Sequence, residues 1–555
     1  MFQASDEKDN PMKYLRYYLL ILFVSILPFI GIFSTADLPH TSDGGVHLPR
    51  MAAYYKALTD GHIPVRWAGD LNYGYGLPLF NFMYHTPYLL SSFFLFLGFG
   101  LVPTFKIVLA LSYVLSGVFM FAFSHAFFRD EKKALLVTIF YQFAPFRLVD
   151  ILVRGALGGI YAYTFFPLVL CAITGFFRKQ SVYRFSVTAL SAFLLIISHN
   201  SLSLMFFALC ILFTFFFPPS SKIRILTVLS LLLGLMMASF YWMPALLEHK
   251  YTYGDLFMKD LYKSHFPPLV NFFIPNLTNA VQLRTAEISV QLGIFHTAAL
   301  LTGIIILLIK KPVDKTLKKL ILFSLLILAG TFFFMQPISL PLWERVSFLR
   351  QFQFPWRLLA IACFATAMLS VTMLNIKFFK KPVPYLLLLA LTIITTVYYW
   401  QPTQGYDKVR EEDFWNYPLN TTYFGETDVI WSAGPAHEYP KERVQAIEGN
   451  AQIINFIKKT HVHTFAVDAS TGTKLVDHTQ YFPGWRVYVD GQKVPVEFQN
   501  QLWRGLITFP VPAGLHSVKV VFEESKVRSV ADALSIVSFV ALACMLIYTR
   551  VKRVV

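Results

Sequence analysis

Apolar stretches long enough to cross a bilayer alternate with polar segments along most of this chain. A spanning helix needs roughly 20 apolar residues, and its backbone must satisfy its own hydrogen bonds. The pattern predicts a multi-spanning α-helical membrane protein with about 12 transmembrane helices, at residues 17–33, 104–128, 134–147, 157–177, 185–200, 201–217, 224–246, 294–309, 319–335, 357–375, 383–400 and 531–549. The apolar segment 86–101 lies between Thr86-Pro87 and Gly98-Phe99-Gly100, and we expect an interfacial or re-entrant helix there.

The pattern changes after residue 400, where apolar and polar residues alternate over short segments. Strands are predicted at 462–467, 485–489, 494–498, 505–509 and 516–522, separated by turn signals such as Pro483-Gly484 and Asp490-Gly491. A small antiparallel β-sandwich fits this alternation best.

The predicted organisation therefore has three parts. Residues 1–400 form a polytopic transmembrane domain, whose loop 34–103 carries juxtamembrane helices. Residues 401–530 form a β-rich module, and residues 531–555 form a C-terminal transmembrane helix and tail.

Charge adds an orientation to this picture. The formal net charge is +16, but the lysines and arginines are spread over short loops on alternate turns of the chain, such as 129–133, 178–184 and 377–381. The positive-inside rule places these loops and the C-terminal tail in the cytoplasm of a multi-pass cell-membrane protein. The long loops and the β-rich module are then extracytoplasmic. Because the positive charge is explained by orientation, no nucleic-acid partner is expected.

Polar and titratable side chains are concentrated in the loop after the first span. Asp43 stands before a segment, 48–58, with apolar groups at helical spacing, and His47, Arg66 and His85 follow in the same loop. An acidic residue in this place can bind a divalent cation, take a proton from an acceptor hydroxyl, or cap the helix. Capping alone does not account for so many titratable groups beside a membrane span.

A second group is Arg147, Asp150 and Arg154, which are spaced three and four residues apart and would share one face of a helix. One arginine would hold a phosphate while the other positions Asp150. The alternative is a self-neutralising surface triad.

A third group consists of His199, between two spans, the basic residue Lys250 in a later long loop, and Arg345, Arg350 and Arg357 around the next one. They are candidates for lining an anionic site for a phosphate headgroup. Simple contact with lipid phosphates, and a turn role for His199, remain alternatives. The sequence has no Gly-Lys-Ser/Thr phosphate loop, dinucleotide glycine fingerprint or His-Glu-x-x-His helix. Coupling to bound ATP is therefore not expected.

Several motifs resemble a known superfamily. They are Ser42-Asp43-Gly44-Gly45-Val46-His47, Gly61-His62-Ile63-Pro64-Val65-Arg66-Trp67, Asn81-Phe82-Met83-Tyr84-His85-Thr86-Pro87-Tyr88 and, in the module, Tyr481-Phe482-Pro483-Gly484-Trp485. On these motifs the chain resembles the GT-C superfamily of integral membrane glycosyltransferases, and more closely the bacterial YfhO-type membrane proteins.

The resemblance implies a GT-C-like fold and transfer of a sugar from a polyprenyl-phosphate-linked donor to an extracytoplasmic envelope glycan or polymer. Asp43 would be the base or metal ligand, with Asp150 as the second acidic position. A divalent metal, Mg or Mn, stays an open choice, since Asp43 is followed by Gly44 where many members carry a second acid. The module would bind the acceptor or cover the site.

Two rival functions share the hydrophobic body: a transporter or flippase of a lipid-linked glycan, and a non-catalytic scaffold for envelope assembly. A coupled transporter is expected to carry charged residues inside its spans, and few are found there.

Overall fold

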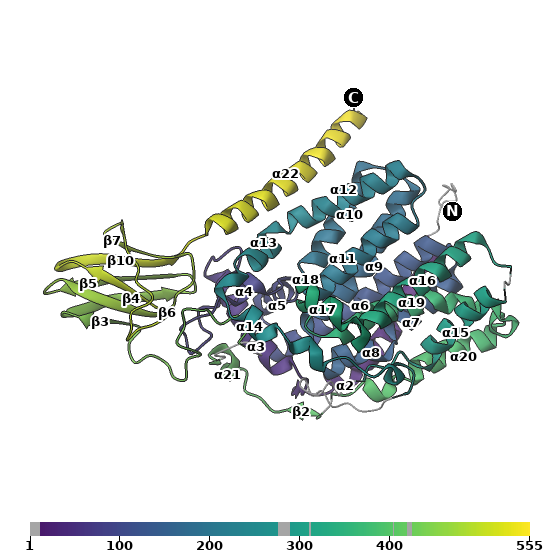
Figure 1. Ribbon diagram of the computed structural model, residues 1–555, viewed down its shortest axis with the longest axis horizontal. Helices are drawn as coiled ribbons and strands as arrows, with labels where there is room; N and C mark the ends of the chain where they lie inside the picture. Colours follow the sequence, from purple (N-terminus) through teal and green to yellow (C-terminus); the bar gives the residue numbers. More distant parts are fainter. Residues whose placement is uncertain (1–10, 276–288, 310–311, 403, 419–424, 555) are drawn as a thin grey trace.

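A helical body and a β-rich module make up the computed structural model, which describes residues 11–275, 289–309, 312–402, 404–418 and 425–554 (Figure 1). Parts of two long loops, 276–288 and 419–424, lie outside the described residues. The main helices are α1 (Pro11–Ile26), α2 (Ile30–Phe33), α3 (Gly44–Thr59), α4 (Leu79–Phe82), α5 (Thr86–Phe96), α6 (Leu101–Phe128), α7 (Glu131–Gln142), α8 (Pro145–Leu148), α9 (Leu157–Arg178), α10 (Val182–Ile196), α11 (Ser201–Phe216), α12 (Ser221–Met237), α13 (Ser239–Leu247), α14 (Gly254–Met258), α15 (Ile294–Leu308), α16 (Lys315–Phe334), α17 (Leu340–Arg345), α18 (Ser347–Arg350), α19 (Leu359–Leu369), α20 (Pro382–Ile394), α21 (Glu412–Trp415) and α22 (Lys526–Val554).

Helix forms at each of the segments in which the hydrophobic pattern predicted a span. Among the described residues, seven helices are long and apolar enough to cross a membrane, and two bent pairs, α7 with α8 and α12 with α13, bring that number to nine. The remaining predicted spans, α10, α11 and α15, are apolar helices of 15, 16 and 15 residues. The chain is thus a multi-spanning helical membrane protein. The count of twelve and the orientation stay predictions.

Polar caps start several of these helices beside the basic loops. Asp130, Ser181, Ser220 and Asp314 each accept a backbone hydrogen bond from the third residue of the helix that follows. Such caps satisfy donors that a helix start otherwise leaves open.

The short segment predicted not to cross is α5, whose 11 residues measure about 16 Å and cannot span a hydrocarbon core of about 30 Å.

The β-rich module consists of two antiparallel sheets (Figure 1). Its strands are β3 (Val444–Glu448), β4 (Ala451–Lys459), β5 (Val462–Ala469), β6 (Thr473–Gln480), β7 (Trp485–Val489), β8 (Gln492–Val494), β9 (Leu506–Val511) and β10 (Gly514–Phe522). One sheet has the order β4-β5-β10-β7-β8 and the other β3-β6-β9. The strand predicted at 494–498 is displaced, since β8 ends at Val494 and Glu497 makes only an isolated bridge to Thr508. β3, β4 and β6 were not predicted.

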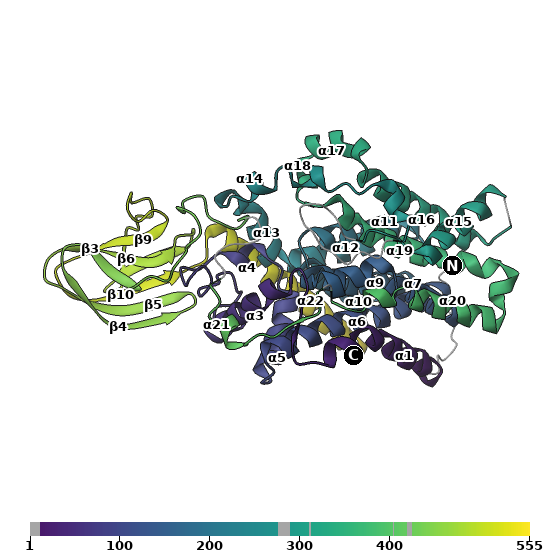
Figure 2. The ribbon, with the colours of Figure 1, turned by 90° about the horizontal axis from the view of Figure 1, so that it is seen from below.

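The first long loop is built into the module rather than lying free of it. Trp67 and Phe82 belong to the module's hydrophobic core, and the Trp67 ring packs edge-on against Trp485 at 5.4 Å between centroids. The Asp60 carboxylate accepts hydrogen bonds from the backbone and hydroxyl of Thr460. Figure 2 shows the module next to α3, α4 and α21 at one end of the helical body. This junction fixes the module relative to α3.

Helix α22 returns from the module along the outside of the helical body (Figure 1). Only 22% of the most apolar stretch of this helix is buried. Val537, Val540 and Ile547 are exposed, as expected of a surface that faces lipid. It packs against α13 and α12.

Candidate functional site

Backbone hydrogen bonds join the loop after the first span to the loop after α8. The Ser42 amide donates to the Val153 carbonyl at 3.2 Å, and the Asp43 amide donates to the Arg154 carbonyl at 2.8 Å. Gly155 lets the chain turn here, because its φ is +69° and a Cβ at this position would overlap the Thr41 hydroxyl. Two polar segments far apart in the sequence are thereby held side by side.

Asp43 is the residue before α3, but its carboxylate does not cap the helix. Within the described part of the chain its side chain makes no capping bond, and the Gly44 amide donates instead to the Thr41 hydroxyl at 3.0 Å. The Asp43 carboxylate faces the Arg154 guanidinium, with 3.8 Å between Oδ2 and Nη2. The helix-cap alternative for Asp43 is therefore wrong.

Arg154 bridges the two acidic residues that the sequence singled out. Its Nη1 donates to the Asp150 carboxylate, and its Nη2 faces Asp43. The guanidinium also lies over the Trp356 ring, 4.9 Å from the centroid. The side chains of Arg154 and Asp150 are only 9% and 5% exposed, so this charge cluster sits out of bulk water.

Two further arginines surround the pair. Burial raises the pKa of Asp43, and the opposing positive charges come from Arg154, Arg50 and Arg357, while Asp150 adds to the rise. Arg50 lies on α3, and Arg357 lies in the turn that leads into α19, where its Nη1 donates to the Ser201 hydroxyl and the Phe352 carbonyl. With three guanidinium groups and two carboxylates, the cluster suits an anionic ligand.

A narrow pocket opens on this cluster. Its lining includes Phe146, Asp150, Arg154, Ala156, Gly159, Tyr163, His199, Leu202, Trp356, Arg357 and Ala360. Tyr84 stacks on His199 at 5.3 Å and on Tyr88 at 5.7 Å, which forms an aromatic wall beside the charges. A Cβ at Gly159 would come within 3.3 Å of the Asp150 carboxylate, so this glycine keeps the helix backbone close to the acid.

The donor set does not fit a resident divalent metal. Among the described residues there is no group of three or more His, Cys, Asp or Glu side chains placed to hold one. Arg154 occupies the position between Asp43 and Asp150 that a bridging cation would take.

No protein-family model matches the sequence, and no curated protein sequence matches it significantly. Among solved structures, the chain is similar to the arabinofuranosyltransferase AftD from Mycobacteria, with a TM-score of 0.43 and 16% identity over 69% of this chain and 26% of that one. It is also similar to the Archaeoglobus fulgidus oligosaccharyltransferase, with a TM-score of 0.39 and 12% identity over 75% and 57% of the two chains. A third similar structure is ArnT from Cupriavidus metallidurans bound to undecaprenyl phosphate, with a TM-score of 0.38 and 10% identity over 70% of this chain and 74% of that one.

This chain spans about a quarter of the length of AftD.

Arg147 does not join the cluster. It ends in a cage of tyrosines, with its Cζ 4.6 Å from the Tyr163 centroid and 4.9 Å from that of Tyr141, and its Nη2 donates to the Ser116 hydroxyl at 2.5 Å. The chain from Val149 to Val153 winds as a π-helix, so the three-and-four spacing does not place Arg147 on one α-helical face with Asp150 and Arg154. The expectation of a shared face, and with it the triad alternative, is wrong.

Three other predicted binding residues have partners outside the Asp43–Arg154 cluster. Arg66 is 1% exposed and pairs with Glu524 at 2.9 Å and Asp532 at 2.6 Å, which ties the first loop to the start of α22. Lys250 is exposed and lies over the Tyr251 ring. Arg350 donates to the backbone carbonyls of Trp343 and Glu344 in its own loop. A part for these three side chains in ligand binding stays a prediction.

The two loop histidines are buried in an aromatic network. His47 Nδ1 lies 3.0 Å from the Tyr88 hydroxyl, and His85 Nδ1 lies 2.9 Å from the Tyr54 hydroxyl. Burial lowers the pKa of His85 to about 3 and, with Arg50 and Arg154 nearby, lowers that of His47 well below its usual value. The lowered pKa values favour the neutral imidazoles, whose nitrogens lie within hydrogen-bond distance of tyrosine hydroxyls in this network.

The sequence did not single out Arg50 and Tyr84 as site residues, and it placed Arg357 in a different group from Asp43. Arg50 follows His47 by three residues on α3, and Tyr84 stands in a motif that had already been noted. Their helical spacing and proximity to those motifs were the available signals. Arg357 was a candidate for the anionic site of the third group, but the sequence did not place it beside Asp43, because it reaches the site only when the turn before α19 packs against α11.

Proposed function

We propose that this chain is a GT-C-type membrane glycosyltransferase that moves a sugar from a polyprenyl-phosphate-linked donor to an extracytoplasmic envelope glycan or polymer. The main support for the proposal is that the Arg154 guanidinium faces the carboxylates of both Asp43 and Asp150. Arg50 and Arg357 add positive charge beside them. A carboxylate that can take a proton and cations that can hold a phosphate are the two parts such a reaction needs.

The chemistry can be written on these groups. The acceptor hydroxyl oxygen attacks the anomeric carbon of the donor while its proton passes to the Asp43 carboxylate. The bond between that carbon and the phosphate oxygen breaks, and the polyprenyl phosphate leaves with the electron pair. Arg154, Arg50 and Arg357 stabilise the charge that develops on the leaving phosphate, while Asp150 orients Arg154.

The location of the cluster fits a lipid-borne donor. Asp43 precedes α3, outside the first span, and Arg154 lies at the end of the bent α7–α8 pair. A lipid phosphate at the membrane interface can reach arginines at this level while its sugar extends toward the β-rich module. A flippase needs no group that takes a proton from an acceptor.

Transfer from a radiolabelled polyprenyl-phosphate sugar pool to acceptor, by the purified protein in lipid, tests the proposal. Wild type should transfer label and Asp43→Asn should not. Asp255→Asn, which removes a carboxylate that is 72% exposed on α14, is the matched control and should transfer normally. Lipid translocation without any transfer would favour the flippase. Equal transfer by wild type and Asp43→Asn would remove Asp43 from the mechanism.

A further inference from the structure

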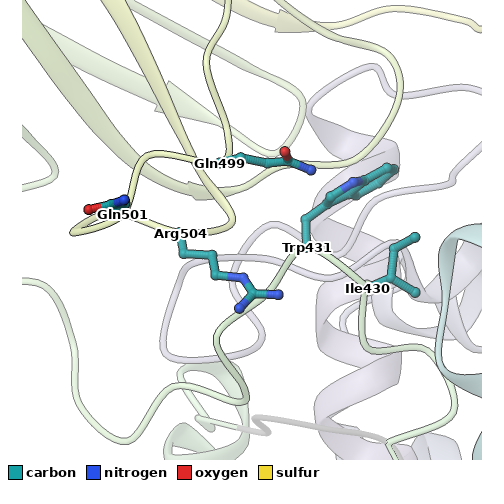
Figure 3. A pocket seen from close by; sticks show the side chains of 5 residues that line it. All are labelled: Ile430, Trp431, Gln499, Gln501 and Arg504. Atoms are coloured by element: carbon teal, nitrogen blue, oxygen red, sulfur yellow. The ribbon is translucent and has the colours of Figure 1, made fainter.

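A second cavity, of about 570 Å³, lies at the junction between the β-rich module and the helical body, and is separate from the Asp43 cluster. Its lining residues are Ile430, Trp431, Gln499, Gln501 and Arg504, whose side chains surround it in Figure 3. Two come from the connector before β3, and three from the loop between β8 and β9.

The connector is fixed where it passes the cavity. The Ile430 amide donates to the Tyr251 carbonyl at 3.2 Å, and Val429 forms a bridge with Thr252. Gly505 lets the β8–β9 loop approach this backbone closely, because its φ is +82° and a Cβ there would come within 2.8 Å of the Ser432 Cα. Backbone contacts therefore hold the two segments that line the cavity next to each other.

The Trp431 ring is held in one orientation by other aromatic rings. It stacks on Tyr251 at 5.5 Å between centroids, and it meets Tyr481 and Phe498 edge-on. Tyr481 and Phe498 in turn stack on each other at 3.8 Å. A tryptophan fixed in this way offers a rigid apolar surface at little entropic cost on binding.

The polar side chains at the cavity are exposed and available to bind a ligand. Within the described part of the chain, Gln499, Gln501 and Arg504 make no hydrogen bond or ion pair. Two amides supply donors and acceptors, and Arg504 supplies donors with a positive charge. A ligand with both hydroxyl and anionic groups would satisfy all three.

We propose that this cavity binds a sugar unit of an anionic glycan. The apolar C–H face of the sugar ring lies against Trp431, the hydroxyls bond to the amides of Gln499 and Gln501, and a carboxylate or phosphate substituent pairs with Arg504. Small-ligand sites of this kind combine apolar surface with a few convergent polar groups. The identification of this glycan as the acceptor rests on the proposed function.

The connector that lines the cavity also leads toward the Asp43 cluster. The Glu426 carboxylate acts electrostatically on Arg50, and Trp431 is the fifth residue after Glu426, so the chain between them spans at most roughly 18 Å. A polymer held at Trp431 can therefore extend toward the arginines. The site would keep a long acceptor attached between transfers.

Binding of two fluorescent oligosaccharide probes to the full-length protein in detergent tests the site: an oligomer of uronic acid and its neutral hexose counterpart. Wild type should bind the uronic acid oligomer about fivefold more tightly than the neutral one. Arg504→Gln should abolish that preference, and Trp431→Ala should weaken both probes by about tenfold, with Trp431→Phe keeping most of the affinity. Arg410→Gln removes an exposed charge elsewhere and should change nothing.

Unchanged affinity in both Arg504→Gln and Trp431→Ala, or no binding of either probe to wild type, would overturn the proposal. Arg504 is exposed, so its variant tests the site even if Trp431→Ala folds poorly. Asp43→Asn should bind the probes like wild type. If wild type binds them but transfers no sugar, the proposed function fails while the glycan site stands.

Discussion

The Asp43 carboxylate lies 3.8 Å from the Arg154 guanidinium, although the two residues belong to different loops. The contact is set by the backbone, since the Asp43 amide also donates to the Arg154 carbonyl. A side-chain pair fixed through the main chain holds its geometry without relying on flexible side chains. Such preorganisation is what a site for charge stabilisation requires.

The pH dependence of transfer should report the Asp43–Arg154 pair. Burial raises the pKa of Asp43, and Arg154 acts against that rise. If the ionised carboxylate is the base, kcat/KM falls as pH drops through the raised pKa of Asp43. Arg154→Gln removes the positive charge that favours ionisation, so the acid limb should move to higher pH and the maximal rate should fall by about 100-fold. Arg154→Lys, which keeps the charge, should leave the acid limb of kcat/KM near its wild-type pH. An acid limb at the same pH in wild type and Arg154→Gln would contradict this assignment.

Gly155 should be intolerant of any side chain. A Cβ would strike Thr41 and would require a φ of +69°, so Gly155→Ala is expected to separate the two loops and destabilise the protein by about 1–3 kcal/mol. Thermal unfolding in detergent and the transfer rate should both fall. Gly45→Ala is the control, because a Cβ there has no atom within 4 Å, and it should match wild type. Equal behaviour of the two variants would mean that the junction at Gly155 is not required.

The sequence predicted the carboxylates better than the arginines. Asp43 and Asp150 stand just outside apolar stretches. A charged residue beside a membrane span is costly, and this local signal can be recognised from the sequence alone. The place of Arg147 depends on the π-helical turn at Val149–Val153, and the place of Arg357 depends on packing between distant segments. Neither leaves a periodic trace in the sequence.

A similar reason applies to the β-rich module. β6 was not predicted because it buries polar residues on both faces, including Asp477, which is 0% exposed and lies 2.6 Å from His463. Burial opposes ionisation of Asp477, but His463 and Arg443 outweigh it and lower its pKa to about 2. Alternation analysis assumes that polar residues face water, and a buried pair of this kind breaks that assumption.

Arg357 should contribute to donor binding, and Arg350 should not. Arg357 lines the pocket beside Asp150, whereas Arg350 bonds only to carbonyls of its own loop among the described residues. Arg357→Gln should raise the KM for the donor about tenfold, the loss of one charge-assisted hydrogen bond. Arg350→Gln removes the same charge and should stay within about twofold of wild type. A larger effect at Arg350 would place the donor phosphate in the other loop.

Arg66 should prove to be a structural residue. Its pairs with Glu524 and Asp532 are buried on the arginine side, so Arg66→Gln should cost about 3 kcal/mol in the free energy of unfolding. Limited proteolysis should show easier cleavage in the connector before β3, while kcat/KM at a permissive temperature stays near wild type. A raised donor KM with unchanged stability would instead make Arg66 a binding residue.

The most direct test of the account is the transfer rate of Asp43→Asn at saturating lipid-linked donor, measured by mass spectrometry of the glycosylated acceptor. Asparagine keeps the size of the side chain and removes the base, so a fall of at least about 100-fold is expected, with donor binding retained. The Asp255→Asn control should transfer at the wild-type rate. Transfer by Asp43→Asn at the rate of wild type would contradict the central claim that Asp43 accepts the acceptor's proton.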